Sequence, residues 1–183
     1  MMVKEHERFL EELLARFSSA PTGPELTHLG ELAHAIWIQA DPEAVWRTYV
    51  DPHRVPDWQT GRPVIEDVHG GPGSTGSTYV SRRGRLAART TVLASEAPAR
   101  LVTRTEAYFG LELVITSRLT QRAGGTDLAL TVETHWSAHG RLVHGIVERA
   151  VLNDREARKE LANLKLLIER EGGTTQGHPP IES

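Results

Sequence analysis

The chain has 183 residues, 39% of them hydrophobic and 25% charged, which suits one globular domain with a substantial core and short extensions. Its 21 Lys and Arg residues against 24 Asp and Glu give a net charge of -3, and no basic run predicts a nucleic-acid partner. Cysteine is absent, which excludes disulfides and cysteine metal sites and suits a reducing compartment. No stretch resembles a signal peptide or approaches the ~20 apolar residues of a membrane span, so we expect a cytoplasmic protein.

Residues 1–30 are predicted to be an appendage to the main domain. Within them, residues 4–17 predict an amphipathic helix, and residues 18–30 are rich in proline and glycine and predict a linker. The apolar side of this helix holds Phe9, Leu10, Leu13 and Phe17. Its polar face is not basic, as a membrane-surface helix would be, so docking on its own domain or in a homodimer is favoured.

The folded body is predicted to begin with a strand at Leu32, in which apolar residues occupy both faces. Asp-Pro dipeptides at 41–42 and 51–52 each supply an N-cap and a first-turn proline. The first opens a helix through Tyr49. The second opens a short helix that Pro56 should end.

Alternating patterns and turn residues then predict a series of strands, followed by a helix. The strands cover residues 64–69, 78–83, 85–95, 101–108, 111–121 and 126–136. Apolar residues at steps of three and four predict one long helix over 141–171, which the glycines at 172–173 should stop. Residues 172–183 are expected to be a disordered tail. Because the last strand has one apolar face, the long helix should lie across the sheet.

Four phrases carry a resemblance to a known family. They are Ala-Asp-Pro-Glu-Ala-Val-Trp at 40–46, Pro-Asp-Trp at 56–58, Gly-Ser-Thr-Gly-Ser-Thr-Tyr at 73–79 and Leu-Ala-Asn-Leu-Lys at 161–165. Together with the order of elements, they resemble the START-like (SRPBCC, helix-grip) superfamily, and within it the bacterial polyketide cyclase/dehydrase and lipid-transport group. The resemblance implies an α+β helix-grip fold. In that fold a seven-stranded curved antiparallel sheet wraps around a long C-terminal helix, with two short helices after the first strand.

The resemblance also implies that residues 31–171 are a ligand-binding domain, with a cavity for an apolar or polycyclic small molecule. Nothing in the chain requires a cofactor. The glycines at 70–76 match neither a phosphate loop nor a dinucleotide fingerprint. A metal site is not expected either, because His135, His139 and His144 straddle a strand, a turn and a helix start without a carboxylate to complete a set.

The pairing of the last two strands predicts which residues face the cavity. A two-residue turn at 124–125 places these residues opposite each other on one face: Leu113 and Trp136, Ile115 and Thr134, Ser117 and Val132, Leu119 and Leu130, Gln121 and Leu128. We expect the cavity to be lined by residues of this face and its neighbours: Trp58, Tyr79, Tyr108, Leu113, Ile115, Ser117, Thr134 and Trp136.

The preceding hairpin, which turns at 109–110, allows two registers. A two-residue loop turns Arg104 and Glu106 into the cavity. A three-residue loop sets Glu106 beside Glu112, which like-charge repulsion disfavours, so the first register is preferred. Arg104 would then hold an enolate or carboxylate, and Glu106 or Asp154 would move a proton. The alternatives are a structural Arg104–Glu106 pair, or both residues in solvent, with Asp154 at the cavity rim.

The sequence therefore leaves two main classes of function. One is a polyketide cyclase/dehydrase-like enzyme that folds an apolar or polycyclic substrate in its cavity and assists cyclisation or dehydration by acid/base chemistry. The other is a non-catalytic carrier or sensor of a hydrophobic ligand or lipid. An inward Arg104 and Glu106 would be more polar than lipid storage needs, which favours the enzyme. A third class, a partner-binding module, would use the outer sheet face and the N-terminal helix.

Overall fold

The computed structural model describes residues 26–107, 110–137 and 154–175. In chain order the elements are β1 (Leu26–Ile38), α2 (Pro42–Val50), the 3-10 helix η1 (Pro52–Arg54), α3 (Val55–Trp58), β2 (Val64–His69), β3 (Thr78–Arg83), β4 (Leu86–Glu96), β5 (Arg100–Glu106), β6 (Leu111–Arg122), β7 (Gly125–Ser137) and α5 (Asp154–Thr175). The strands form one seven-stranded antiparallel sheet in the order β1-β7-β6-β5-β4-β3-β2. This is the predicted α+β helix-grip fold.

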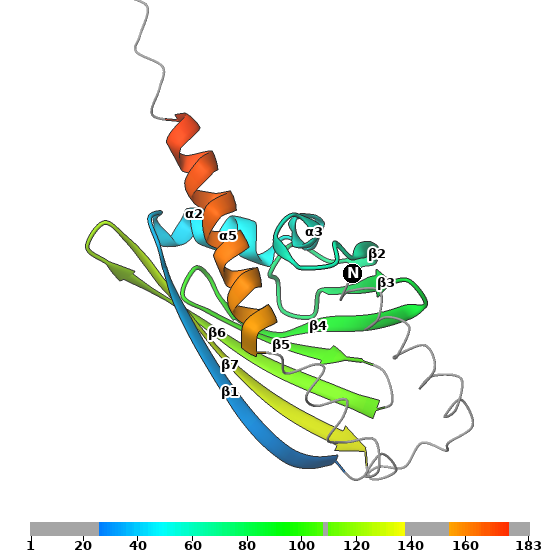
Figure 1. The fold of residues 1–183 in the computed structure, drawn as a ribbon. Coiled ribbons are helices and arrows are strands. Elements are labelled where there is room, and N and C mark those ends of the chain that lie inside the picture. Colours follow the sequence, from blue (N-terminus) through cyan, green and yellow to red (C-terminus); the bar gives the residue numbers. More distant parts are fainter. Residues whose placement is uncertain (1–25, 108–109, 138–153, 176–183) are drawn as a thin grey trace, which may run out of the picture.

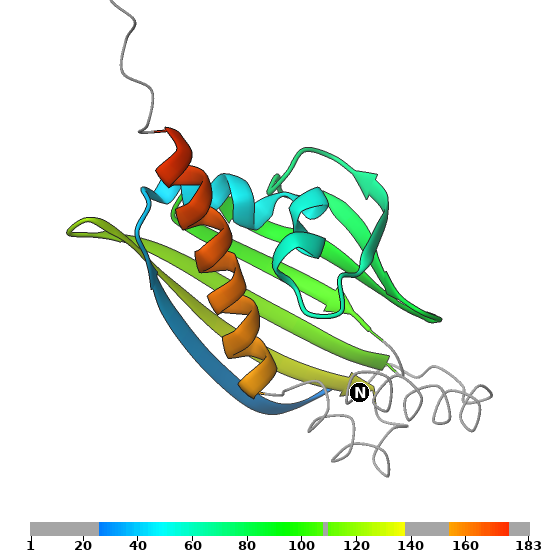
Figure 2. The same ribbon diagram turned by 45° about the horizontal axis from the view of Figure 1, so that its top comes forward.

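The described helices all lie on the concave face of the curved sheet. Helix α5 crosses this face beside β1, and α2 and α3 cover the neighbouring part (Figures 1 and 2). One apolar core joins the layers, with Ile38 from β1, Val45 from α2 and Leu164 from α5 all fully buried. Burial of each such side chain contributes about 2 kcal/mol. No helix in the described part of the chain has the length and apolar character to cross a membrane.

The two short helices begin where the sequence places them, because their caps are local. Asp41 accepts a hydrogen bond from the Ala44 N–H (2.7 Å), and Asp51 accepts one from the His53 N–H (2.9 Å). The expectation for Pro56 was wrong. It lies in the first turn of α3, where a missing N–H leaves no hydrogen bond unmade, so the helix continues to Trp58.

The first strand and the last helix extend beyond the ends predicted for them. Strand β1 begins at Leu26, inside the stretch assigned to the linker, and pairs with β7 through a register shift between His28 and Gly30. Helix α5 continues through Gly172 to Thr175, since glycine weakens a helix by ~1 kcal/mol without forbidding it. The predicted N-terminal helix and residues 141–153 of the predicted long helix lie outside the described residues.

The pairing of β6 with β7 differs from the prediction by two residues. Arg122 pairs with Gly125, so the turn is made by 123–124, and Gly124 adopts a positive φ of 76°. Gly125 is instead a strand residue at a close approach, where a Cβ would lie 2.3 Å from the Ile38 carbonyl oxygen. The observed pairs are Leu111 with Trp136, Leu113 with Thr134, Ile115 with Val132, Ser117 with Leu130 and Leu119 with Leu128. A shift of two keeps every side chain on its predicted face.

The preferred register of β5 with β6 was wrong. Glu106 pairs with Glu112 and Arg104 with Val114, and the Ala107 N–H donates to the Leu111 carbonyl (2.8 Å). Arg104 and Glu106 therefore lie on the convex face, with side chains 40% and 54% exposed. The magnitudes explain this outcome: opposed like charges on a surface cost less than ~1 kcal/mol, whereas burying an ion costs several.

Candidate ligand-binding site

Hydroxyl groups from five elements lie on the concave face. We call them the hydroxyl row, and its members are Tyr49 of α2, Tyr79 of β3, Thr90 of β4, Thr105 of β5 and Ser117 of β6. The register explains the order, since Thr90 stands between Tyr79 and Thr105 across three neighbouring strands. Strand β4 sends alternate residues inward, and Thr90 is buried between Ala88 and Val92 on this face.

Hydrogen bonds join the members of the hydroxyl row in two groups. The Thr90 and Thr105 hydroxyls lie 2.9 Å apart, Tyr79 hydrogen-bonds with Thr90, and the Tyr49 hydroxyl lies 2.7 Å from Ser117 Oγ. Burial raises the pKa of Tyr49 to about 12 and also raises the pKa of Tyr79. Both phenols therefore stay protonated at neutral pH and can donate hydrogen bonds.

Trp58 adds a donor beside the hydroxyl row. Its side chain is only 8% exposed, and its ring centre lies 6.0 Å from that of Tyr49. Among the described residues, none offers a hydrogen-bond acceptor to the buried indole N–H. An unsatisfied buried donor costs about 1–3 kcal/mol, which an oxygen atom of a bound molecule would recover.

The apolar side chains around the hydroxyl row are incompletely packed. Leu113, Ile115 and Val132 point to the concave face, yet each is only half-buried. A filled protein core would exclude solvent from them. The concave face therefore keeps accessible apolar surface beside a small number of hydrogen-bond donors, which is the usual character of a small-molecule site.

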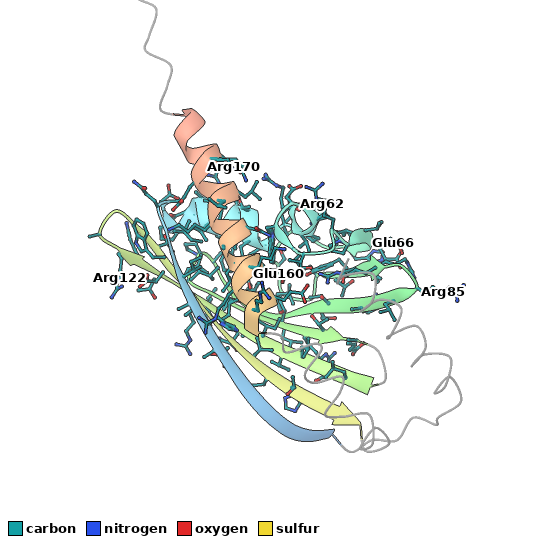
Figure 3. The ribbon with its side chains drawn as sticks, in the orientation of Figure 1. Arg62, Glu66, Arg85, Arg122, Glu160 and Arg170 are labelled. Carbon is teal, nitrogen blue, oxygen red and sulfur yellow. The ribbon has the colours of Figure 1, made fainter. Side chains whose placement is uncertain are left out.

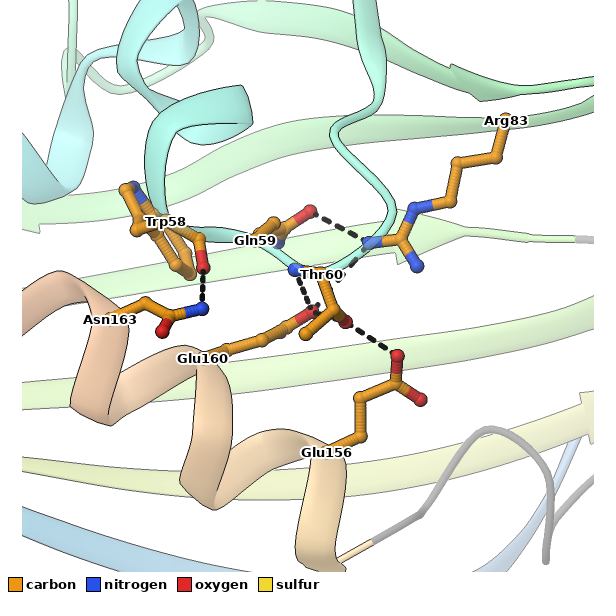
Figure 4. A network of polar contacts seen from close by, with 7 residues as sticks. All are labelled: Trp58, Gln59, Thr60, Arg83, Glu156, Glu160 and Asn163. Atoms are coloured by element: carbon orange, nitrogen blue, oxygen red, sulfur yellow. Dashed lines mark hydrogen bonds and ion pairs between the residues drawn. The ribbon is translucent and has the colours of Figure 1, made fainter. Parts of the chain in front are cut away.

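A second polar group, the carboxylate clamp, fastens α5 to the loop after α3 (Figure 4). It consists of Glu156, Glu160, Thr60, Gln59 and Arg83. Glu160 Oε1 accepts hydrogen bonds from the Thr60 N–H (3.0 Å) and hydroxyl (2.7 Å), and that hydroxyl also contacts Glu156. Arg83 reaches Glu160 (3.6 Å) and Gln59 (3.3 Å) from β3.

Burial raises the pKa of Glu160 despite the opposing Thr60 hydrogen bonds and the Arg83 charge. The Glu160 side chain is only 20% exposed and extends from α5 toward the loop after α3 (Figure 4). One turn further along α5, the Asn163 side-chain amide donates to the Trp58 carbonyl (3.1 Å). The face of α5 that holds the clamp thereby also positions Trp58.

Residues 31–169 match the model of a protein family described as polyketide cyclase / dehydrase and lipid transport. The chain belongs to this family. The match spans most of the chain and includes every residue of the hydroxyl row and the carboxylate clamp. The comparison with curated proteins gives no match.

Several solved structures share the fold of this polyketide cyclase/dehydrase family member. Protein CV1439 from Chromobacterium violaceum is 19% identical with a TM-score of 0.58, covering 76% of this chain and 96% of that one. DynU16, from the dynemicin biosynthetic locus, is 21% identical with a TM-score of 0.53, covering 77% and 48%. A Thalictrum flavum norcoclaurine synthase mutant, in complex with a transition-state analogue, is 13% identical with a TM-score of 0.56, covering 82% and 99%. At these identities the likeness shows the fold alone.

The structure brings together most of the predicted ligand-binding residues of this family member and places two of the predicted catalytic residues, Arg104 and Glu106, on the other face of the sheet. On the concave side, in strands or in the apolar core, lie Trp58, Tyr79, Leu113, Ile115, Ser117 and Thr134. The backbones of Trp136 and Asp154 belong to β7 and α5, but their side chains, and all of Tyr108, lie outside the described residues.

Sequence reasoning missed Tyr49, Thr90, Thr105 and Glu160. The inward alternation of β4 was a usable signal for Thr90, whereas the others depend on contacts between distant segments. No group of three or more His, Asp or Glu side chains suited to a metal occurs among the described residues, which exclude His139 and His144.

Proposed function

We propose that this protein binds a largely apolar, oxygen-bearing small molecule, of the polycyclic or polyketide type, on the concave face of its sheet and assists its cyclisation or dehydration. The observation that carries the proposal is the buried Trp58 N–H without an acceptor, beside a row of protonated hydroxyls and half-buried apolar side chains. The family and its structural relatives, one from a biosynthetic locus and one a synthase, support small-molecule chemistry.

The proposed chemistry uses neutral donors in place of the charged residues that the sequence suggested. A phenol that donates a hydrogen bond to a ketone oxygen draws electron density from the carbonyl carbon. That carbon becomes easier to attack by an enol carbon of the same molecule. The new carbon–carbon bond closes a ring as the C=O π bond opens, the former ketone oxygen gains a proton, and the enol hydroxyl loses one. Tyr79 is the proposed donor for this step, and Trp58 the proposed anchor for a second oxygen.

A non-catalytic carrier is the second candidate, and one observation favours it. With Arg104 and Glu106 on the convex face, the charged residues that the sequence suggested for catalysis lie away from the ligand side, and the charged groups of the carboxylate clamp are engaged in holding α5 to the loop after α3. A binding assay alone does not separate the two candidates. Turnover does, because a carrier would not accelerate ring closure of a linear poly-ketone.

The test compares 1,8-dihydroxyanthraquinone, a tricyclic ketone, with anthracene, which has the same ring skeleton and no oxygen. We expect the quinone to bind the full chain. Tyr79→Phe and Trp58→Phe should each weaken it about fivefold, the equivalent of about 1 kcal/mol for one hydrogen bond, and leave anthracene binding unchanged. Arg104→Leu, on the convex face, is the control and should change neither. Absence of quinone binding, or equal losses for both probes, would overturn the proposal.

A further inference from the structure

The convex face of β5 and β6 carries opposed like charges at both ends. Glu106 pairs directly with Glu112 at one end, and Arg100 pairs directly with Arg118 at the other. We call these four residues the convex charge patch. Like charges directly opposite on neighbouring strands destabilise a sheet, so the arrangement costs free energy in the isolated chain.

Neighbouring residues neutralise only part of the convex charge patch. Arg100 contacts Glu96 at 2.8 Å, and Arg104 lies 3.7 Å from Glu106. In the part of the chain that the structure describes, the side chains of Glu112 and Arg118 have no ion pair of their own. Arg118 is exposed and Glu112 is half-buried, so both charges remain available to a partner.

The centre of this face combines small side chains with one arginine. Between Glu112 and Arg118 on β6, the outward residues are Val114 and Thr116, and on β5 Arg104 stands opposite Val114 and Val102 opposite Thr116. Arg104 lies 3.7 Å from Glu106, so its charge is directed toward the glutamate end of the patch. Glu112 and Arg118 are six positions apart on one strand, which corresponds to about 20 Å. Strands β6 and β5 are the third and fourth in the seven-stranded order, so the patch lies at the middle of the sheet, and no described helix covers it (Figures 1 and 2).

We propose that this face is an interface between two copies of the chain, related by a two-fold axis that runs between the two sheets and across the strands. The rotation reverses the strand direction while keeping β5 over β5 and β6 over β6. Glu112 of one copy then faces Arg118 of the other, and Glu106 faces Arg100. Packed sheets lie about 10 Å apart, a gap that a glutamate and an arginine reach across from opposite sides.

The same charge pattern argues against other occupants of the face. An axis parallel to the strands would superpose Glu112 on Glu112 and Arg118 on Arg118. An anionic partner would meet the glutamate end, and a cationic partner would meet the arginine end, so each would gain at one end and lose at the other. A second copy in the antiparallel arrangement satisfies both ends at once.

The test is sedimentation of the full chain at low and high salt. The wild type should form a dimer that salt weakens. Arg118→Glu and Glu112→Arg should each weaken it at least about tenfold, because each creates two repulsive contacts per dimer. Two rescues should restore association: the double variant as a homodimer, and an equimolar mixture of the two single variants as a heterodimer. Arg85→Glu, at the exposed turn between β3 and β4, changes the net charge by the same amount as Arg118→Glu and should have no effect on the dimer (Figure 3).

Three results would overturn the proposal. They are a wild type that stays monomeric at the highest attainable concentration, a dimer that neither single variant weakens, and single variants that dissociate without either rescue. Circular dichroism checks that each variant is folded. If Arg118→Glu is not folded, Arg118→Gln and Glu112→Gln replace the single variants. If both of these variants dimerise as tightly as the wild type, the proposal is also overturned.

Discussion

At the scale of single residues, Glu160 is the most informative titratable group. The Thr60 hydroxyl contacts both Glu160 and Glu156, yet a hydroxyl has one proton to donate. A protonated carboxyl would supply the second proton, and of the two carboxyl groups Glu160 is the one whose pKa is raised by burial. The carboxylate clamp therefore has its full set of hydrogen bonds when Glu160 is neutral.

We predict that part of the stability is lost as pH rises through the raised pKa of Glu160. The folded state holds this proton more tightly than the unfolded state, where the ordinary value is 4.5. The contribution is therefore complete below 4.5 and declines above it, until Glu160 is ionised in both states. Glu160→Gln keeps the shape and the acceptor for Thr60 but cannot ionise, so this decline should disappear from its urea-unfolding curves measured over a pH series.

Glu169→Gln is the matched control for this prediction. Glu169 lies on the same helix and also accepts a backbone hydrogen bond, from the Gln39 N–H (2.8 Å). The Glu169→Gln variant should still lose stability with rising pH in the way assigned to Glu160. A pH dependence in Glu160→Gln that matches the wild type would mean that the burial of this carboxyl does not influence folding.

At the scale of elements, the strands show what a sequence can predict about a sheet. Alternation assigned the correct faces to β6 and β7, because a face depends only on a period of two. The register of β6 with β7 depended on whether Gly125 belongs to the turn or to the strand. The close approach of Gly125 to Ile38, which is distant in the chain, favours the strand position. For β5, the penalty of opposed glutamates was local and visible, but the larger penalty of burying Arg104 and Glu106 decided the outcome.

Contacts between elements were the least predictable part of the candidate site. The caps of α2 and η1 were predictable because Asp41 and Asp51 bond within three residues. Tyr49 became part of the site only because α2 docks its hydroxyl on Ser117, far along the chain. Such a pair leaves no pattern in either segment alone.

We predict that the Tyr49–Ser117 hydrogen bond is a measurable part of the docking of α2 on β6. Tyr49→Phe leaves the Ser117 hydroxyl, which is 1% exposed, without its partner, so the free energy of unfolding should fall by about 1–3 kcal/mol. Ser117→Ala should have a similar effect. The double variant should cost little more than either single one, because no orphaned hydroxyl remains. Urea unfolding of all four proteins measures the coupling, with Thr120→Ala on the exposed side of β6 as control; strictly additive losses would contradict the bond.

At the scale of the whole molecule, the sheet separates the hydroxyl row from the charged residues of β5 and β6. The concave face presents hydroxyls and apolar side chains to α2, α3 and α5, whereas the arginines and glutamates of β5 and β6 lie on the convex face. The proposed ligand and the proposed second copy would therefore occupy opposite faces. Binding to one face need not displace the partner on the other.

The domain boundary provides the last prediction. The first residues of β1 pair with the end of β7, with Leu26 opposite Ser137 and Glu31 opposite Glu133. Deleting residues 1–25 removes no described pairing, so the domain should keep its unfolding temperature. Deleting residues 1–31 removes the start of an edge strand and leaves one edge of the end of β7 unpaired. The unfolding temperature should then fall by several degrees, as expected for a loss of about 1–2 kcal/mol or more.

Thermal unfolding of the full chain and both truncations measures the effect. Equal unfolding temperatures for the two truncations would mean that the start of β1 contributes nothing to the stability of the sheet. A large fall in unfolding temperature on removing residues 1–25 would mean that the N-terminal segment is integral to the domain. Sedimentation of the variant that lacks residues 1–25 also distinguishes a dimer formed through the convex charge patch from one formed through the predicted N-terminal helix. Association through the convex charge patch survives the deletion of residues 1–25, whereas association through the predicted N-terminal helix does not.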